Sequence, residues 1–133
     1  MSPGTEQYRR GIYVVLKRGS PYPSFINFDA TARLACRVKR GASNTPLQAL
    51  TLLNDPVYVE AARAFAARIV REKRDASAEE KLRHAFQLAV AREPRDSELA
   101  ILRKLLEQEL PGDAAWFAVA SALLNLDETI TKN

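Results

Sequence analysis

The chain has 133 residues, of which 47% are hydrophobic and 27% are charged, with a formal net charge of +4 and one cysteine. This length is enough for one domain with a sizeable core, but it leaves little room for two independent domains. No run of about 18 apolar residues occurs, which excludes a helical membrane span, and the single Cys36 excludes an internal disulfide.

The positive charge is concentrated in the first third of the chain. Residues 1–42 carry eight Lys and Arg against two acidic residues, whereas residues 43–133 carry twelve against fourteen. The basic side chains are scattered along the first segment and are not aligned on one helix. Such a surface fits a solvated face or an acidic partner better than nucleic acid, so we do not expect nucleic acid as a partner.

The first 42 residues give a mixed signal. Tyr8, Ile12 and Leu16 recur four apart, which favours a helix, although the β-branched residues among them would also suit a strand; we expect a basic helix. Beyond it, Pro21 and Pro23 hold the backbone extended. We expect a long ordered loop here, pinned to the core by apolar side chains, namely Tyr22, Phe25, Ile26 and Phe28.

Two short Pro-containing breaks mark helix starts. Thr45 is placed to cap a helix that begins at Pro46 and runs to Leu53. Asp55-Pro56 repeats the device and opens a longer helix to Glu72. The apolar residues of this second helix recur four apart, as expected for one buried face: Val57, Ala61, Phe65 and Ile69.

Three further helices follow. Ser77 and Glu80 form a capping box before a helix that should end near Arg92, because Pro94 follows. Asp96 and Ser97 open the next one, which stops at Pro111-Gly112, and Asp113 is placed to cap a last helix from Ala114 to about Ile130. The sequence therefore predicts an all-α fold, a compact bundle of five to six helices with a long ordered N-terminal loop. We expect a single domain over 1–133, with the basic helix and loop in 6–42 and the helical core in 43–130.

One group of polar residues is the candidate binding site. If the loop over 25–43 folds back onto the first two helix starts, these side chains meet where free N–H groups form an anion pocket. The residues are Asp29, Cys36, Arg40, Asn44, Thr45, Gln48, Asn54 and Asp55. In the alternative interpretation, Thr45 and Asp55 only cap helices, the asparagines occupy turns, Gln48 lies on the outer face and Asp29 pairs with a local arginine.

The residue types that carry catalysis or bind metals are sparse. His84 is the only histidine, so it lacks partners for a metal site, and we interpret it as an ordinary helix-surface residue. Cys36 beside Arg37 could react as a thiolate or pack as a small hydrophobe. The glycines are dispersed and form no phosphate loop. We therefore expect no catalytic residue, no metal and no cofactor.

Several segments resemble a known family. "YRRGIYVVLKRGSPYPSFINFDA", "NTPLQALTLLNDPVYVEAARAFAARI", "HAFQLAVAREPRDSEL" and "LLNLDETI" stand in an order and spacing similar to domain of unknown function 1553. That domain is the C-terminal domain of large planctomycete and verrucomicrobial proteins, often beside planctomycete cytochrome-c-type domains. The resemblance implies a fragment of a larger exported protein in the periplasm or cell envelope, and it transfers no catalytic residue.

These observations lead to a hypothesis of function. We expect a non-catalytic helical interaction module that docks onto neighbouring domains of its parent polypeptide. The alternatives are a partial, carbohydrate-related enzyme site completed by another domain, and a module that binds an anionic polymer. Tyr13, Val14 and Val15 cannot all point inward from one helix, so we also expect an exposed apolar patch and, in isolation, a homodimer.

Overall fold

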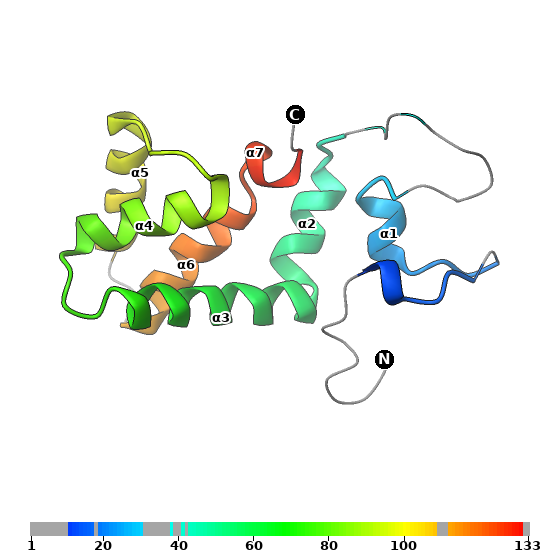
Figure 1. Cartoon of the computed structure of the whole chain (residues 1–133), viewed down its shortest axis with the longest axis horizontal. Helices are drawn as coiled ribbons and strands as arrows, with labels where there is room; N and C mark the ends of the chain where they lie inside the picture. The colour runs from blue at the N-terminus through cyan, green and yellow to red at the C-terminus, as the bar shows by residue number, and fades with distance from the viewer. Residues whose placement is uncertain are drawn as a thin grey trace. The chain divides into compact units, whose positions relative to one another are not determined.

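The computed structural model describes residues 11–17, 19–30, 38, 41, 43–108 and 112–131. Within these ranges every regular element is helical and no strand is found, which confirms the all-α prediction. The chain divides into two compact units, residues 1–42 and 43–133. Figure 1 shows the helices of each unit, and no described helix is long and apolar enough to cross a membrane.

The described part of the first unit holds a 3₁₀ turn, η2 (Gly11–Tyr13), and a short helix, α1 (Pro23–Asn27). The predicted basic helix is wrong over its described part, since residues 14–17 are not helical and η2 closes with a Val14 N–H to Gly11 C=O bond of 3.2 Å. The two consecutive β-branched valines that follow lower the helix propensity of this segment. Tyr13 and Val15 are 70% and 78% exposed, so the expected exposure of these side chains is confirmed, and the homodimer stays a prediction.

Helix α1 occupies part of the segment that we predicted to be an extended loop. Tyr22 is extended, as a residue before proline should be, but Pro23 then takes the first helical position, where its missing N–H costs nothing. The Tyr22 and Phe25 rings meet edge to face with centroids 5.8 Å apart. A Cβ at Gly11 would lie 2.9 Å from the Phe25 ring, so a larger residue at this position would require the ring to shift.

The second unit contains six helices among the described residues. They are α2 (Pro46–Asn54), α3 (Pro56–Glu72), α4 (Ala78–Val90), α5 (Asp96–Glu107), α6 (Asp113–Leu124) and α7 (Asp127–Ile130). The caps predicted for the first three are confirmed: the side chains of Thr45, Asp55 and Ser77 each accept a bond from a backbone N–H in the first turn. Local side-chain chemistry therefore sets these three starts.

The last predicted helix is wrong in two respects. It is broken after Leu124, because the Asn125 side chain donates to the Ser121 carbonyl at 2.9 Å and Thr129 Oγ1 donates to the Leu123 carbonyl at 2.9 Å. Side chains thus occupy carbonyls near the end of α6, and the chain turns before α7. Asp113 is also not the cap, since α6 begins at this residue after Gly112, whose φ is +43°.

Helix α4 ends two residues earlier than predicted. Its C-cap is Ala91 with φ of 61°, a left-handed conformation that non-glycine residues rarely adopt. The turn leaves Arg92 outside the helix and free to point toward other elements.

Helix α6 is the central element of the second unit. It contacts each of the other five helices, and in Figure 1 it runs from α3 past α4 toward α7. Burial of apolar side chains around it supplies the core, at about 1.5–3 kcal/mol for each large residue removed from water. The core cluster comprises Ile69, Leu82, Ala85, Phe86, Leu99, Leu102, Val119 and Leu123.

Candidate functional site

The residues of the predicted binding site are distributed over both units. Cys36 and Arg40 lie outside the described residues. Asp29 belongs to the first unit, just after α1, and has a left-handed backbone with φ of 55°. The remaining five, Asn44, Thr45, Gln48, Asn54 and Asp55, lie on α2 and at its two ends.

At the start of α2, Thr45 and Gln48 form a capping box. The Gln48 backbone N–H donates to Thr45 Oγ1 at 3.3 Å, and the Thr45 N–H donates to Gln48 Oε1 at 2.8 Å. Gln48 Nε2 also donates to Ser43 Oγ at 3.1 Å. Gln48 is only 1% exposed, so the expectation that it lies on the outer face is wrong. Two of these hydrogen bonds are made by the side-chain amide, which satisfies both its oxygen and its nitrogen at a buried position.

At the other end of α2, Asn54 and Asp55 also bond to nearby backbone. Asn54 Nδ2 donates to the Leu50 carbonyl at 2.9 Å, and the Val57 N–H donates to Asp55 Oδ1 at 2.9 Å. Nine helical residues separate Thr45 from Asp55, a rise of about 13 Å. The two breaks therefore serve two separate helix starts, and the assignment of these residues to a ligand stays a prediction.

Tertiary contacts add residues that the sequence did not single out. Asn44 Nδ2 donates to Asp127 Oδ1 at 2.8 Å, across 83 residues, and Thr131 Oγ1 donates to the same carboxylate oxygen at 3.0 Å. This contact joins the segment before α2 to α7. Asp127 is the first residue of α7 and Asn44 precedes the N-cap of α2; both are exposed, and no local pattern marks them as a pair.

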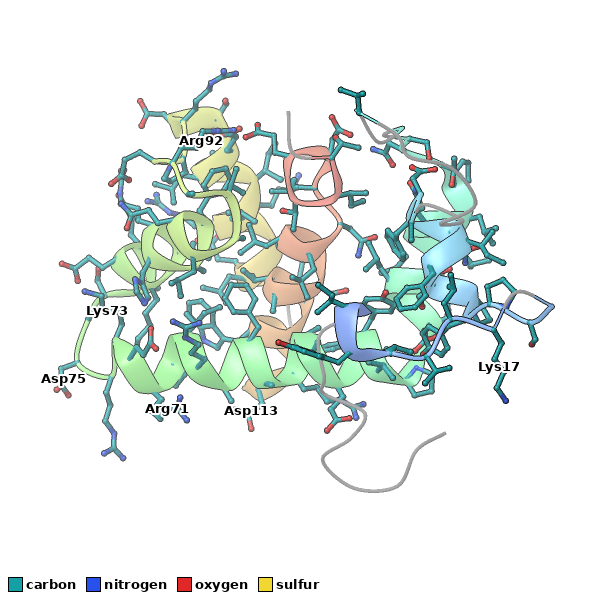
Figure 2. The ribbon with its side chains drawn as sticks, turned by 45° about the vertical axis from the view of Figure 1, so that its right-hand side comes forward. Lys17, Arg71, Lys73, Asp75, Arg92 and Asp113 are labelled. Carbon is teal, nitrogen blue, oxygen red and sulfur yellow. The ribbon has the colours of Figure 1, made fainter. Side chains whose placement is uncertain are left out.

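Arg92 is the most strongly paired charge in the described chain. Its guanidinium donates to both carboxylate oxygens of Glu98, at 2.9 and 2.7 Å, and to both of Glu128, at 2.8 and 2.6 Å. It also lies 4.8 Å from the centroid of the Phe86 ring. Figure 2 shows Arg92 at the end of the unit where α4 leads into α5. Arg92 therefore connects the end of α4 and the start of α5 to α7.

These contacts shift the acid–base behaviour of the cluster. Hydrogen bonds first from Arg92 and then from the Arg95 backbone N–H lower the pKa of Glu98 to about 2. Arg92 likewise lowers the pKa of Glu128, and the two carboxylates raise the pKa of Arg92 above its ordinary value. All three groups are charged at neutral pH and already paired, so the cluster offers neither a general base nor a free anion site.

His84 lies in a second, smaller charged group. Its Nε2 is 2.9 Å from Glu72 Oε2, and Arg68 Nε donates to the other oxygen of Glu72 at 2.8 Å. Bonds from Arg68 and then His84 lower the pKa of Glu72. No nucleophile adjoins the ring in these contacts, and the described residues contain no group of three potential metal ligands. His84 is thus a residue of α4 whose ring contacts the Glu72 carboxylate, and its interpretation as an ordinary helix-surface residue stays a prediction.

The outward side of α2 is apolar. Leu47, Leu50 and Leu53, spaced three apart, are 54%, 57% and 54% exposed, while Gln48 on the same helix is buried. We call these three residues the leucine stripe. An exposed row of leucines beside a buried amide reverses the usual pattern of a surface helix. The sequence pattern does not indicate this surface, because the run "LQALTLL" places apolar residues on both sides of the helix.

Comparison with known proteins identifies one relationship. The family model PSD1, described as a protein of unknown function (DUF1553), matches residues 1–106. No curated protein and no solved structure matches the chain. The matched range ends inside α5, so it includes the leucine stripe and Arg92 but not α6, which supplies Val119 and Leu123 to the core.

Proposed function

Because the chain belongs to the PSD1 family of proteins of unknown function (DUF1553), we propose a function from its own surface. It is a non-catalytic helical interaction module of a larger envelope protein. It docks onto a neighbouring domain of the same polypeptide, and the leucine stripe on α2 is the docking face. The single observation that carries the proposal is the exposure of Leu47, Leu50 and Leu53 beside buried Gln48.

The polar chemistry of α2 supports docking over catalysis. Thr45, Gln48, Asn54 and Asp55 each bond to backbone at the helix ends. Their bonded atoms hold the helix in place, whereas the leucines between them have no comparable role in the fold. Apolar surface presented by a rigid, doubly capped helix is suited to packing against another folded surface.

The size of the stripe indicates what kind of partner it can hold. Covering the exposed half of each leucine is worth about 1 kcal/mol, or about 3 kcal/mol in all. Association of two free molecules costs at least about 4 kcal/mol in lost translational and rotational freedom. A domain linked in the same chain pays less of that cost, because the connecting chain already restricts its translation and rotation. The stripe is thus adequate for an intramolecular neighbour and too small for a free partner.

Thiol labelling tests this proposal. In a Cys36→Ser background, Leu50→Cys is compared with Ile101→Cys on α5, which is a matched control because Ile101 is 68% exposed. Both are measured in this chain alone and in the longer envelope polypeptide that we propose as its parent. We expect Leu50→Cys to react at least about tenfold more slowly in the longer protein, as a docked position should, and Ile101→Cys to react equally in both.

Two results would contradict the proposal. Equal labelling of Leu50→Cys in the short and long chains would show that nothing covers the stripe. Protection of Ile101→Cys without protection of Leu50→Cys would move the docking face to α5. Circular dichroism of each variant confirms that the helices are intact before labelling is interpreted.

A further inference from the structure

A groove between α3 and α6 is separate from the leucine stripe. It has a volume of about 560 Å³, within the range of protein binding sites. Residues from two turns of α3 form one wall, and the first turn of α6 forms the other. The lining residues used below are Arg63, Ala67, Val70, Asp113, Trp116 and Phe117.

The floor of the groove is apolar and aromatic. Trp116 packs on the core cluster and also lines the groove, so its ring is shared between the two. Phe117 is half-buried, and Ala67 is exposed because no side chain covers it. The alanine leaves space in front of the two rings, which a larger residue at position 67 would fill.

Helix α6 is almost entirely apolar, although part of its surface is not covered by the other helices. Asp113 is its only charged residue, and Ser121 is its only other polar side chain. A helix that is apolar all round is normally buried on every side. Trp116, Phe117 and Ala118 are nevertheless only partly buried, so α6 leaves apolar surface uncovered at the groove.

Two arginines lie on the groove side of α3, with Glu60 one turn before the first of them. Arg63 and Arg71 lie eight residues apart, with Ala67 midway, so they project from the same side of α3. Arg63 rests 5.7 Å from the centroid of the Phe117 ring, and neither arginine has an ion pair among the described residues. In Figure 2 Arg71 and Asp113 both extend below α3. The groove side of α3 therefore carries two positive charges between residues 63 and 71, and Asp113 places one negative charge at the start of α6.

We propose that this groove is the docking site for an acidic amphipathic helix of a partner polypeptide. Arg63, Ala67 and Val70 follow an i, i+4, i+7 spacing over about 10 Å, which matches two turns of a helical ligand. The apolar face of that helix covers Trp116 and Phe117, and its carboxylates lie along Arg63 and Arg71. A small molecule is a less suitable ligand, because the groove is open to solvent at Ala67 and much of the molecule's surface would stay in contact with water.

A matched set of peptides tests the charge preference. One fluorescein-labelled 18-residue peptide carries Leu at i, i+3, i+4 and i+7 with Glu along one edge, and a second carries Lys at those Glu positions. We expect the acidic peptide to bind more tightly by roughly three- to tenfold at low salt, since each exposed ion pair contributes little. The double variant Arg63→Glu with Arg71→Glu should reverse the preference.

Two matched variants on α3 test the location. Ala67→Glu fills the groove floor and should weaken binding of the acidic peptide at least about tenfold, as loss of a central contact does. Ala64→Glu adds the same charge to another exposed alanine of α3 that does not line the groove, and it should leave binding unchanged. Both variants should retain the wild-type helical signal and melting temperature, because both alanines are on the surface.

Each remaining outcome would overturn the proposal. Equal binding of the two peptides would remove the charge argument, and an unaffected Ala67→Glu variant would place the binding elsewhere. If sedimentation shows that Ala67→Glu dissociates a dimer, the occupant is a second copy of this chain. If decanoate binds the groove and neither peptide does, the occupant is a small amphiphile.

Discussion

Helices α2 and α4 begin with the same local device and end with opposite patterns of burial. Each has a capping box, Thr45 with Gln48 in α2 and Ser77 with Glu80 in α4. Helix α4 buries Leu82 and Phe86 and keeps Glu80 exposed, whereas α2 buries Gln48 and exposes its leucines. A capping box therefore specifies where a helix begins, but it carries no information about which side faces the core.

The difference lies in what surrounds each helix. Helix α4 packs against α3, α5, α6 and α7, while α2 packs against α3 and α6 within the second unit. Because α2 has fewer neighbouring helices, fewer of its side chains are buried. Gln48, the polar residue of its capping box, is the one that lies on the buried side. The leucines on the outward side then have no partner among these helices, which is the basis of the proposed docking face.

The largest expected effect comes from truncating the α4 core. Phe86→Ala should lower the free energy of unfolding by about 3 to 5 kcal/mol, because a buried aromatic ring leaves a cavity. Leu50→Ala on α2 should change it by no more than about 0.5 kcal/mol, as for an exposed residue. Urea denaturation followed by circular dichroism measures both. If Phe86→Ala does not fold, Phe86→Leu provides a milder test, and similar losses at both positions would contradict the contrast.

The next largest expected effect is the difference in stability lost when the glutamine or glutamate of each capping box is replaced. Gln48→Ala should cost about 1 to 3 kcal/mol, because the Thr45 N–H and the Ser43 hydroxyl lose partners at a buried position. Glu80→Ala should cost less than about 1 kcal/mol, since water replaces the lost bonds at an exposed one. The same urea titration compares them. A larger loss for Glu80→Ala would mean that Gln48 is not the buried anchor of α2.

A smaller effect is expected from the cap that joins α2 to α3. Asp55→Ala removes the acceptor of the Val57 N–H bond and should cost about 1 kcal/mol. Asp75→Ala is the matched control, because Asp75 lies in the exposed turn after α3, and it should stay within about 0.5 kcal/mol. Thermal melts of the two variants decide the point, and an unchanged midpoint for Asp55→Ala would remove the cap argument.

The smallest expected effects are changes in the free energy of unfolding at acidic pH. The α2 box contains a neutral amide, whereas hydrogen bonds from the Ser77 N–H and hydroxyl lower the pKa of Glu80, and Arg92 with the Arg95 N–H lowers the pKa of Glu98 to about 2. A carboxyl with a depressed pKa contributes stability that is complete above its ordinary pKa of 4.5 and is lost as the pH falls toward 2. The free energy of unfolding should therefore decline over this window.

Amide hydrogen exchange at several pH values measures this difference helix by helix. Protection should fall in acid at the starts of α4 and α5 before it falls at the start of α2. Arg92→Gln should weaken the acid dependence at α5 and leave that at α4 unchanged. Equal acid sensitivity at all three helix starts would contradict the role assigned to the carboxylates.

Prediction from sequence succeeded where the decisive contacts are local. Thr45, Asp55 and Ser77 lie within three residues of the N–H groups that they cap, so their roles could be inferred directly. It failed over the described residues from Gly11 to Leu16, where a helical spacing coincided with β-branched residues of lower helix propensity. It also failed at Asn125, because the side-chain bonds that end α6 compete with a helical pattern that continues to Ile130.

The candidate site shows the same limit. Asn44, Thr45, Asn54 and Asp55 were identified as polar residues at two breaks, and the capping roles of Thr45 and Asp55 followed from residue type. The pairing of Asn44 with Asp127, and of Arg92 with Glu128, joins residues 83 and 36 positions apart. Periodicity has no means of finding such pairs, because their proximity depends on how α7 folds back.

By itself, the sequence determined the helical class, the starts of α2, α3 and α4, and the family, because capping, proline geometry and apolar spacing act within one or two turns. Only the tertiary structure decided that Gln48 is buried while Leu47, Leu50 and Leu53 are exposed, and that α3 and α6 leave a groove. The physical reason is that a side chain is buried only when a second surface packs against it. A helix in isolation has an apolar side, but what covers that side depends on elements placed beside it by the rest of the chain or by a partner.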